Sequence, residues 1–266
     1  MADPLTLWRR FLARPNDDRF KTFGIAVLVA FTCAVVVSVA SVALKPLQDA
    51  HLEAERAAKM EAMLNTLPEM RGLMQEAGIT ELETRLVNLS DGSFVPNLDT
   101  ADFDAIAAAD HPATSIEIPS EADVAGLKRR EHHSLVHLLE SDGELKLLVL
   151  PMRAAGYQST ITAMLALQPD LRTIAALTIT GQGETPGLGA RIAEPDWAAL
   201  WPGKQIADDD GKIVIDIVRG QATGPYEIDG IAGATRSSNA VGVMLDFWLG
   251  DLGFGPFLDR LEVEGL

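Results

Sequence analysis

Cysteine, aromatic residues and positive charge are all scarce in this sequence of 266 residues. Cys33 is the single cysteine, which excludes an intrachain disulfide and a cysteine-based zinc or iron–sulfur site. Aromatic residues make up 6% of the chain, so its core must be built mainly from Ala, Leu, Val and Ile. Redox chemistry in such a chain would require an organic cofactor or a partner protein.

The shortage of positive charge narrows the range of partners. The chain has 22 Lys and Arg against 38 Asp and Glu, which gives a formal net charge of -16. Nucleic-acid binding needs Lys and Arg clustered on one face, so we expect no nucleic-acid partner. The same shortage disfavours flat binding to an anionic membrane surface. An acidic composition of this kind mainly keeps a protein soluble.

One long hydrophobic run is present, and residues 22–44 contain no charged residue. As a helix this run would be about 34 Å long, slightly more than a bilayer hydrocarbon core of roughly 30 Å. A cleaved signal peptide is the alternative, but the hydrophobic part of a signal peptide usually has only about 7–15 residues. We therefore expect a transmembrane helix that contacts membrane lipid.

The cations around this run predict its orientation. Five Lys and Arg residues lie within residues 1–21, whereas Lys45 is the only cation in residues 45–54. Positive residues stay on the cytoplasmic side of a membrane. The sequence thus predicts a cytoplasmic tail at residues 1–21, a transmembrane helix at 22–44 and a periplasmic domain at 45–266. Such a chain would lie in a bacterial inner (plasma) membrane.

Hydrophobic periodicity predicts a single α+β domain after the membrane helix. The Pro169-Asp170 break between two β-rich runs indicates a hairpin. The predicted elements are a helix over 48–77, strands over 144–151, 161–168, 173–180 and 212–219, and a helix over 237–249.

Three histidines raise the possibility of a metal site, namely His132, His133 and His137. Positions four apart would share one face of a helix. No second set of ligands accompanies them in the sequence, so we predict a solvated face and no metal site.

Two segments could bind a cofactor, and the first is Asp229–Thr235, with the sequence DGIAGAT. Its small residues allow the backbone to approach a bulky group closely. Thr235 precedes a predicted helix, whose N-terminal amides can bind a phosphate. The simpler interpretation is a glycine-containing turn that caps the helix.

The second segment is Gly183–Gly189, with the sequence GETPGLG, directly after a predicted strand. Its glycines and proline favour a tightly defined loop. Glu184 and Thr185 are its polar candidates for ligand contact, and Leu188 could cover an apolar ring face. By itself this segment too could be only a turn.

The chain resembles the C subunit of the sodium-translocating NADH:quinone reductases along most of its length. The ending Phe247–Phe257 is the most discriminating part of the resemblance, because it favours this family over the related G subunit of Rnf complexes. The other matching segments are Asn16–Asp18, Ala43–Gln48, Leu165–Leu171, Glu184–Gly189, Trp197, Trp201–Lys204 and Asp229–Thr235.

The resemblance implies a flavoprotein subunit of a membrane complex that couples NADH oxidation by ubiquinone to sodium export. It implies FMN linked to Thr235 as a phosphoester, attached by a separate flavin transferase, and electron exchange with the other subunits. Thr235 would thus be a modification target, and no catalytic residue is expected in the chain. The residues implied as binding FMN are Thr235, Asp229, Gly233, Ala234, Glu184, Thr185, Gly187, Leu188 and Gly189.

Two positions depart from the family pattern. Ala232 stands where the flavin attachment motif usually has Ser or Thr, and Arg153–Thr160 lacks an expected tryptophan. Two alternative functions remain at this point. One is the G subunit of an Rnf-type ferredoxin:NAD oxidoreductase, and the other is a flavin-free, single-span periplasmic scaffold.

Overall fold

The computed structural model describes residues 13, 15, 18–38, 83–96, 100, 103–141 and 143–266. They belong to two compact units, Met1–Ala62 and Met63–Leu266, and each is described by itself. The helix predicted over residues 48–77 lies outside the described residues.

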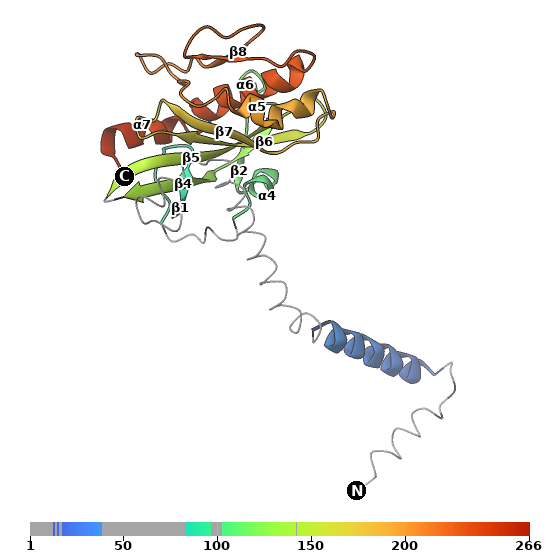
Figure 1. The fold of residues 1–266 in the computed structure, drawn as a ribbon. Helices are drawn as coiled ribbons and strands as arrows, with labels where there is room; N and C mark the ends of the chain where they lie inside the picture. The colour runs from blue at the N-terminus through green and yellow to red at the C-terminus, as the bar shows by residue number, and fades with distance from the viewer. Residues whose placement is uncertain are drawn as a thin grey trace. The chain divides into compact units, whose positions relative to one another are not determined.

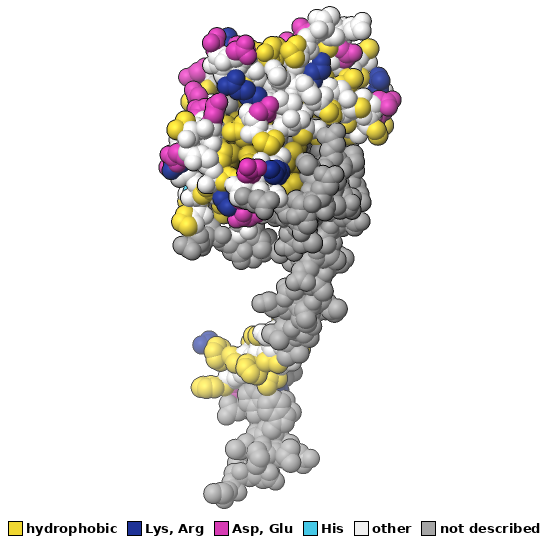
Figure 2. All heavy atoms as spheres, turned by 60° about the vertical axis from the view of Figure 1, so that its left-hand side comes forward, with side chains coloured by type: hydrophobic (Ala, Val, Ile, Leu, Met, Phe, Trp, Pro, Cys, Tyr) yellow, Lys and Arg dark blue, Asp and Glu magenta, His cyan; other side chains and the backbone are white. Residues whose placement is uncertain are grey.

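The first unit contains a helix at Arg19–Ser38 that is long and apolar enough to cross a membrane, with a mean hydropathy of 2.2. The carboxylate of Asp18 caps it by accepting a 2.8 Å hydrogen bond from the backbone nitrogen of Phe20. Its apolar side chains are exposed, and in Figure 2 the described part of the helix is mainly yellow. The predicted span of 22–44 overlaps this helix, and residues 39–44 lie outside the described residues.

The second unit is built on a five-stranded antiparallel sheet with the strand order β1-β4-β5-β6-β7 (Figure 1). Consecutive strands from β4 to β7 are neighbours, so this part of the sheet is a meander. The strands are β1 (Glu83–Asn88), β4 (His133–Ser141), β5 (Glu144–Ala155), β6 (Thr160–Leu167) and β7 (Ile174–Gly181).

Further elements lie before and after the meander in the sequence. The helix α4 (Ala105–Asp110) precedes the antiparallel pair β2 (Ser115–Glu117) and β3 (Arg129–Glu131). After β7 follow the 3₁₀ helix η1 (Gly189–Ala193), α5 (Pro195–Ala198), the parallel pair β8 (Asp216–Val218) and β9 (Glu227–Asp229), α6 (Thr235–Leu249) and α7 (Gly255–Glu264).

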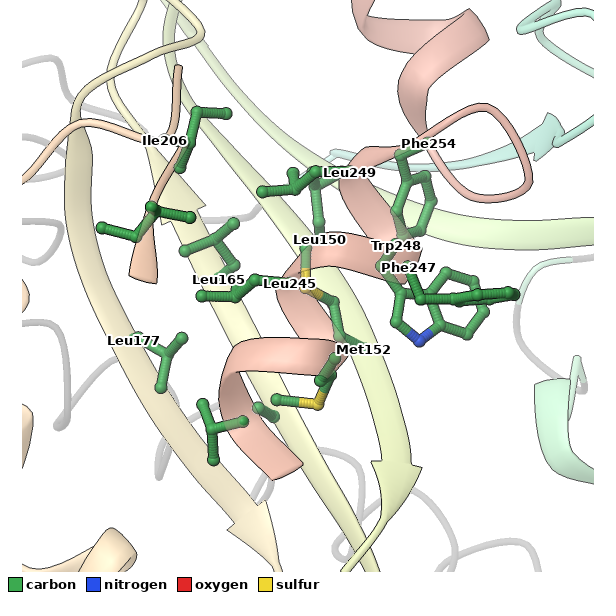
Figure 3. Packing of buried hydrophobic residues seen from close by; sticks show 14 of the residues in the cluster. Leu150, Met152, Leu165, Leu177, Ile206, Leu245, Phe247, Trp248, Leu249 and Phe254 are labelled. Atoms are coloured by element: carbon green, nitrogen blue, oxygen red, sulfur yellow. The ribbon is translucent and has the colours of Figure 1, made fainter. Parts of the chain in front are cut away.

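The core lies between the sheet and α6. Every second residue of β5 and β6 points toward the helix, because successive side chains of a strand alternate between its faces. Leu150 and Met152 of β5 and Leu165 of β6 meet Leu245 and Trp248 of α6, and all five are at most 3% exposed (Figure 3). The apolar residues of α6 recur at three- and four-residue spacing, which gives the helix one buried face.

Strand β5 also carries a buried charged residue, Arg153. Arg153 is 8% exposed and forms two hydrogen bonds to the fully buried carboxylate of Glu131, one of them 2.9 Å long from Nη1 to Oε1. The guanidinium of Arg153 also lies 5.1 Å from the ring centroid of Trp248. Trp248 in turn donates a 2.7 Å hydrogen bond to the backbone oxygen of Arg153. The ion pair is therefore part of the contact between α6 and the sheet.

We expect Glu131→Gln to lower the free energy of unfolding of the domain by about 3 kcal/mol, because it leaves the buried guanidinium without its counter-charge. The control is Glu264→Gln, which removes an exposed ion pair to Arg260 of 2.8 Å and should cost less than about 1 kcal/mol. Urea unfolding monitored by tryptophan fluorescence measures both values. Equal effects of the two substitutions would contradict a structural role for the buried pair.

Most of the predicted elements are confirmed. The hairpin of 161–168 and 173–180 is β6 and β7, the strand of 144–151 is the first part of β5, and the helix of 237–249 is most of α6. The strand predicted over 212–219 is shorter, because β8 pairs with β9 over only three residues and Ile213 makes a separate bridge to Ala207. The domain thus combines helices with a sheet in the α+β manner.

The prediction that His132, His133 and His137 form a solvated face is wrong for His137. This residue lies in strand β4, so a helical spacing of four does not apply. Its Nδ1 is 3.0 Å from Oγ1 of Thr84 on the neighbouring strand β1. Burial lowers the pKa of His137 to about 4, and the ring is neutral at physiological pH.

This lowered pKa predicts a loss of stability in mild acid. The unfolded chain binds a proton at His137 near pH 6.5, whereas the folded domain binds it only near pH 4, so the stability falls as the pH drops through this window. We expect His137→Gln to remove roughly 1–3 kcal/mol of the loss between pH 7 and pH 4. Urea unfolding at a series of pH values measures it, with the exposed His111→Gln as control. Parallel pH curves for wild type and His137→Gln would contradict the assignment.

Candidate flavin site

Three segments that are distant in the sequence meet beside the first turn of α6. They are the turn between β5 and β6 at residues 156–159, the loop at residues 183–189 after β7, and the segment Asp229–Thr235 before α6. The sheet explains the first contact, because Thr162 near the start of β6 pairs with Gly181 at the end of β7. In an antiparallel pair, the start of one strand lies beside the end of its neighbour, so these two residues are at the same end of the strand pair.

Thr235 is the first residue of α6, and its side chain is exposed. The residue before it, Ala234, offers no side-chain cap, and the first turn of the helix contains no acidic residue. Gly233 has a φ of +82°, which a residue with a side chain adopts only with strain, and its turn directs the chain into the helix. A hydroxyl group thus stands at an uncapped helix N-terminus, where backbone amides favour an anion.

Arg236 adds a positive charge at the same place. Its guanidinium lies 5.0 Å from the ring centroid of Tyr157, which belongs to the turn between β5 and β6. Both side chains are exposed, and Tyr157 is 57% exposed. On the loop after β7, Leu188 is 50% exposed and its side chain lies near Gly233. The site therefore offers a hydroxyl, a cation and two exposed apolar groups.

Glu184 is buried beneath these exposed groups, at 4% exposure. Its Oε2 accepts a 2.6 Å hydrogen bond from the hydroxyl of Ser237, and its Oε1 accepts a 3.0 Å hydrogen bond from the backbone nitrogen of Gln158. Burial acts to raise the pKa of Glu184, but hydrogen bonds from the backbone of Gln158, from the Ser237 hydroxyl and from the backbone of Ser159 and Tyr157 outweigh it. The pKa is lowered as a result, and the carboxylate is charged.

The remaining site residues predicted from the sequence have three kinds of surroundings. Thr185, Gly187 and Gly189 lie in the loop beside the first turn of α6, and the hydroxyl of Thr185 accepts a 3.0 Å hydrogen bond from the Gln158 side chain. Asp229 instead supports the chain: its carboxylate accepts from the backbone nitrogen of Ala222, and its backbone oxygen accepts a 2.9 Å hydrogen bond from Trp197. Ala234 is buried, so only its backbone could contact a ligand.

Sequence reasoning did not name the side chain of Arg236, and it left open whether residues 153–160, which include the turn at residues 156–159, contact flavin. The turn could have been found from the predicted hairpin, because a meander brings the turn before β6 next to the end of β7. A cleft of about 720 Å³ adjoins this turn, but neither Thr235 nor Arg236 nor Leu188 lines it. Ser159 and Gly183 line it and also contact each other through a 2.6 Å hydrogen bond.

Comparison with known families agrees with this geometry. Residues 156–250 match the family model described as an FMN-binding domain, and this range contains all three segments of the site. The fold and the site thus define a flavin-binding domain that follows a helix able to cross a membrane.

Relatives of similar length identify the family. The Na(+)-translocating NADH-quinone reductase C subunit of Pseudomonas aeruginosa is 38% identical over 255 residues, which cover 93% of this chain and 97% of that protein. Its counterpart in Vibrio anguillarum is 34% identical over 96% of this chain and 100% of that protein. The crystal structure of Shewanella oneidensis NqrC matches with a TM-score of 0.68 and 28% identity, over 78% of this chain and 100% of that one. The chain therefore belongs to the C-subunit family of the Na(+)-translocating NADH-quinone reductases, which confirms the resemblance seen in the sequence.

Proposed function

We propose that this chain is the subunit that carries a covalently bound FMN in a sodium-pumping NADH:quinone reductase, with the FMN phosphate esterified to Thr235. The observation that carries the proposal is the position of Thr235. Thr235 is the exposed first residue of the uncapped helix α6, and Arg236 is next to it. Both lie inside the matched FMN-binding domain. Membership of the C-subunit family supports the wider role in coupling NADH oxidation by ubiquinone to sodium export.

The residues present fit a phosphate ester. The backbone amides of the first turn of α6 and the guanidinium of Arg236 would hold the phosphate, and the exposed Leu188 and Tyr157 would contact apolar parts of the flavin. When bound, FMN supplies one- and two-electron transfer, while the protein places it and adjusts its surroundings. The loop at residues 183–189 would supply backbone contacts from Gly187 and Gly189 and polar contacts from Thr185.

Attachment requires a second protein. No acid or base in the described part of the site contacts the Thr235 hydroxyl through a hydrogen bond, which fits a residue modified by a separate flavin transferase. With FAD as donor, the oxygen of Thr235 would form the bond to phosphorus and AMP would leave. NADH binding is not expected in this chain, because the sequence contains no G-x-G-x-x-G loop after a strand.

We further propose that the helix Arg19–Ser38 is part of a single membrane anchor, with the N-terminus in the cytoplasm and residues 45–266 in the periplasm. The five cations within residues 1–21, before and at the start of the helix, support this orientation. The anchor would contact membrane lipid and hold the flavin near the other subunits of the complex. Electrons would pass through this flavin between cofactors of those subunits.

We expect Thr235→Val to abolish covalent flavin while leaving the domain folded, because Val has the shape of Thr but no hydroxyl to esterify. The variant is expressed together with the flavin transferase, and covalent flavin is read from fluorescence on a denaturing gel and from the mass of the peptide containing residue 235. Thr180→Val is the matched control, since Thr180 is exposed on β7 and its hydroxyl contacts Thr162. Flavin that remains attached to Thr235→Val would place the linkage at another residue.

The orientation can be tested with single cysteines introduced after Cys33→Ala has removed the native thiol. We expect a membrane-impermeant maleimide to label Ser90→Cys in intact spheroplasts, because Ser90 is an exposed residue of the domain. Ala13→Cys, in the tail before the helix, should react only after the membrane is opened. Labelling of Ala13→Cys alone in intact spheroplasts would reverse the proposed topology.

A further inference from the structure

Glu184 has two features that a flavin-contacting side chain does not need. It is only 4% exposed, and both of its carboxylate oxygens are already engaged by protein donors, Oε1 by the backbone nitrogen of Gln158 and Oε2 by the hydroxyl of Ser237. These donors belong to two different segments, the turn between β5 and β6 and the first turn of α6. One carboxylate therefore joins three segments that are separated by 26 and 53 positions in the sequence.

Two glycines make room for this carboxylate. A Cβ atom at Gly156 would lie 2.6 Å from Oε1 of Glu184, and a Cβ atom at Gly189 would lie 2.9 Å from Oε2. A Cβ atom at Gly189 would also collide with the hydroxyl of Ser237. Neither glycine has a positive φ, so the need for glycine here is one of space and not of backbone conformation. The carboxylate thus occupies a cavity that is fitted closely around it.

Further hydrogen bonds tie the same segments together outside this cavity. The backbone nitrogen of Gly183 donates a 2.6 Å hydrogen bond to Oγ of Ser159, and the side chain of Gln158 donates a 3.0 Å hydrogen bond to Thr185. These contacts join only the loop after β7 to the turn between β5 and β6. Among these contacts, the hydrogen bond between Ser237 and Glu184 alone extends the connection to α6.

We propose that Glu184 is a positioning residue that locks the loop at residues 183–189 and the turn at residues 156–159 onto the first turn of α6, and is not itself a flavin ligand. The proposal rests on the proposed attachment of FMN to Thr235. Ser237, two residues after Thr235, is on the buried side of the helix while Thr235 is exposed. The hydrogen bond from Ser237 to Glu184 therefore holds the first turn of α6 in one orientation, and this sets the direction in which the Thr235 hydroxyl faces. It also holds Leu188 and Tyr157 beside the helix N-terminus.

There is a physical reason why the positioning side chain at residue 184 is a carboxylate. Hydrogen bonds to a charged acceptor are roughly twice as strong as those between neutral groups, so the single side chain of Glu184 can hold both the turn at residues 156–159 and the first turn of α6. An amide in its place could still accept from Gln158, but its NH₂ group would meet the Ser237 hydroxyl and force that hydroxyl to reverse from donor to acceptor. An alanine would leave the backbone amide of Gln158 and the buried hydroxyl of Ser237 without an acceptor. The severity of the defect should therefore follow the order Glu184→Ala, then Glu184→Gln, then wild type.

The test uses full-length protein expressed without and with the flavin transferase. In the flavin-free protein we expect Glu184→Ala to accelerate hydrogen exchange at the Gln158 amide roughly ten- to hundredfold, the factor that corresponds to loss of hydrogen bonds to a charged group. Ser237→Ala should produce a smaller acceleration at the same amide, and Glu184→Gln should partly restore protection. Glu194→Gln, an exposed glutamate ten positions further on, and Asn239→Ala, an exposed residue of α6, are the matched controls.

The flavin readout follows from the same variants. With the transferase present, the initial rate of flavin incorporation should fall roughly tenfold in Glu184→Ala, and Ser237→Ala combined with it should add little further loss, because both remove one contact. If Glu184→Ala loses flavin while the Gln158 amide stays protected and Ser237→Ala behaves as wild type, Glu184 is a direct ligand and the lock is wrong. Wild-type incorporation in Glu184→Ala also overturns it. If FMN proves to be attached elsewhere, the proposed function fails in the Thr235→Val experiment, whereas the exchange measurement still decides whether the lock exists.

Discussion

The packing of α6 on the sheet is the constraint on which the site depends. Leu245 lies near Leu150 and Leu165, and Trp248 lies beside β5 (Figure 3). Trp248 also donates a hydrogen bond to the backbone oxygen of Arg153. A helix held by one buried face and one specific hydrogen bond has little freedom to rotate or slide. Its N-terminus therefore has a fixed place beside the ends of β5, β6 and β7. Because these strands form a meander, the turn between β5 and β6 and the loop after β7 both lie at the same end of the strands.

Because α6 is packed in this way, the residues at its N-terminus can be exposed to solvent and still have a fixed position. Thr235 and Arg236 face solvent, as the proposed attachment of FMN by a separate enzyme would require. Directly beneath them, Ser237 is buried and bonded to a charged carboxylate. Burying a carboxylate is costly unless hydrogen bonds compensate it, and here backbone amides of the turn at residues 156–159 and the Ser237 hydroxyl provide them. The buried contact between Ser237 and Glu184 therefore fixes the position of the exposed residues Thr235 and Arg236 above it.

The sequence predicts the parts of this structure that depend on local patterns. The hairpin of β6 and β7 follows from alternating apolar residues around Pro169-Asp170, and α6 follows from helical spacing. The second half of β5 was missed because Arg153 interrupts the apolar run, and its counter-charge, Glu131, is 22 positions away. His137 was misplaced for a related reason, since a spacing of four has a different meaning in a strand. Glu184 was predicted from the sequence as a polar ligand contact, but the donors that define its buried environment, Gln158 and Ser237, come from segments that no local pattern connects to it.

The charge of the protein bears on why the proposed FMN would be held covalently. A net charge of -16 opposes the binding of an anionic cofactor, although salt screens that repulsion beyond roughly 8 Å at physiological ionic strength. Within that distance of Thr235 the local groups decide, and they are the amides of an uncapped helix, the adjacent Arg236 and no acid in the first turn of α6. The charged Glu184 lies close by, but its two oxygens are occupied by donors that partly neutralise it. A site with one cation and one helix terminus favours a phosphate without enclosing it. A covalent ester would therefore retain the cofactor on an exposed surface, where non-covalent contacts of this number would allow it to dissociate.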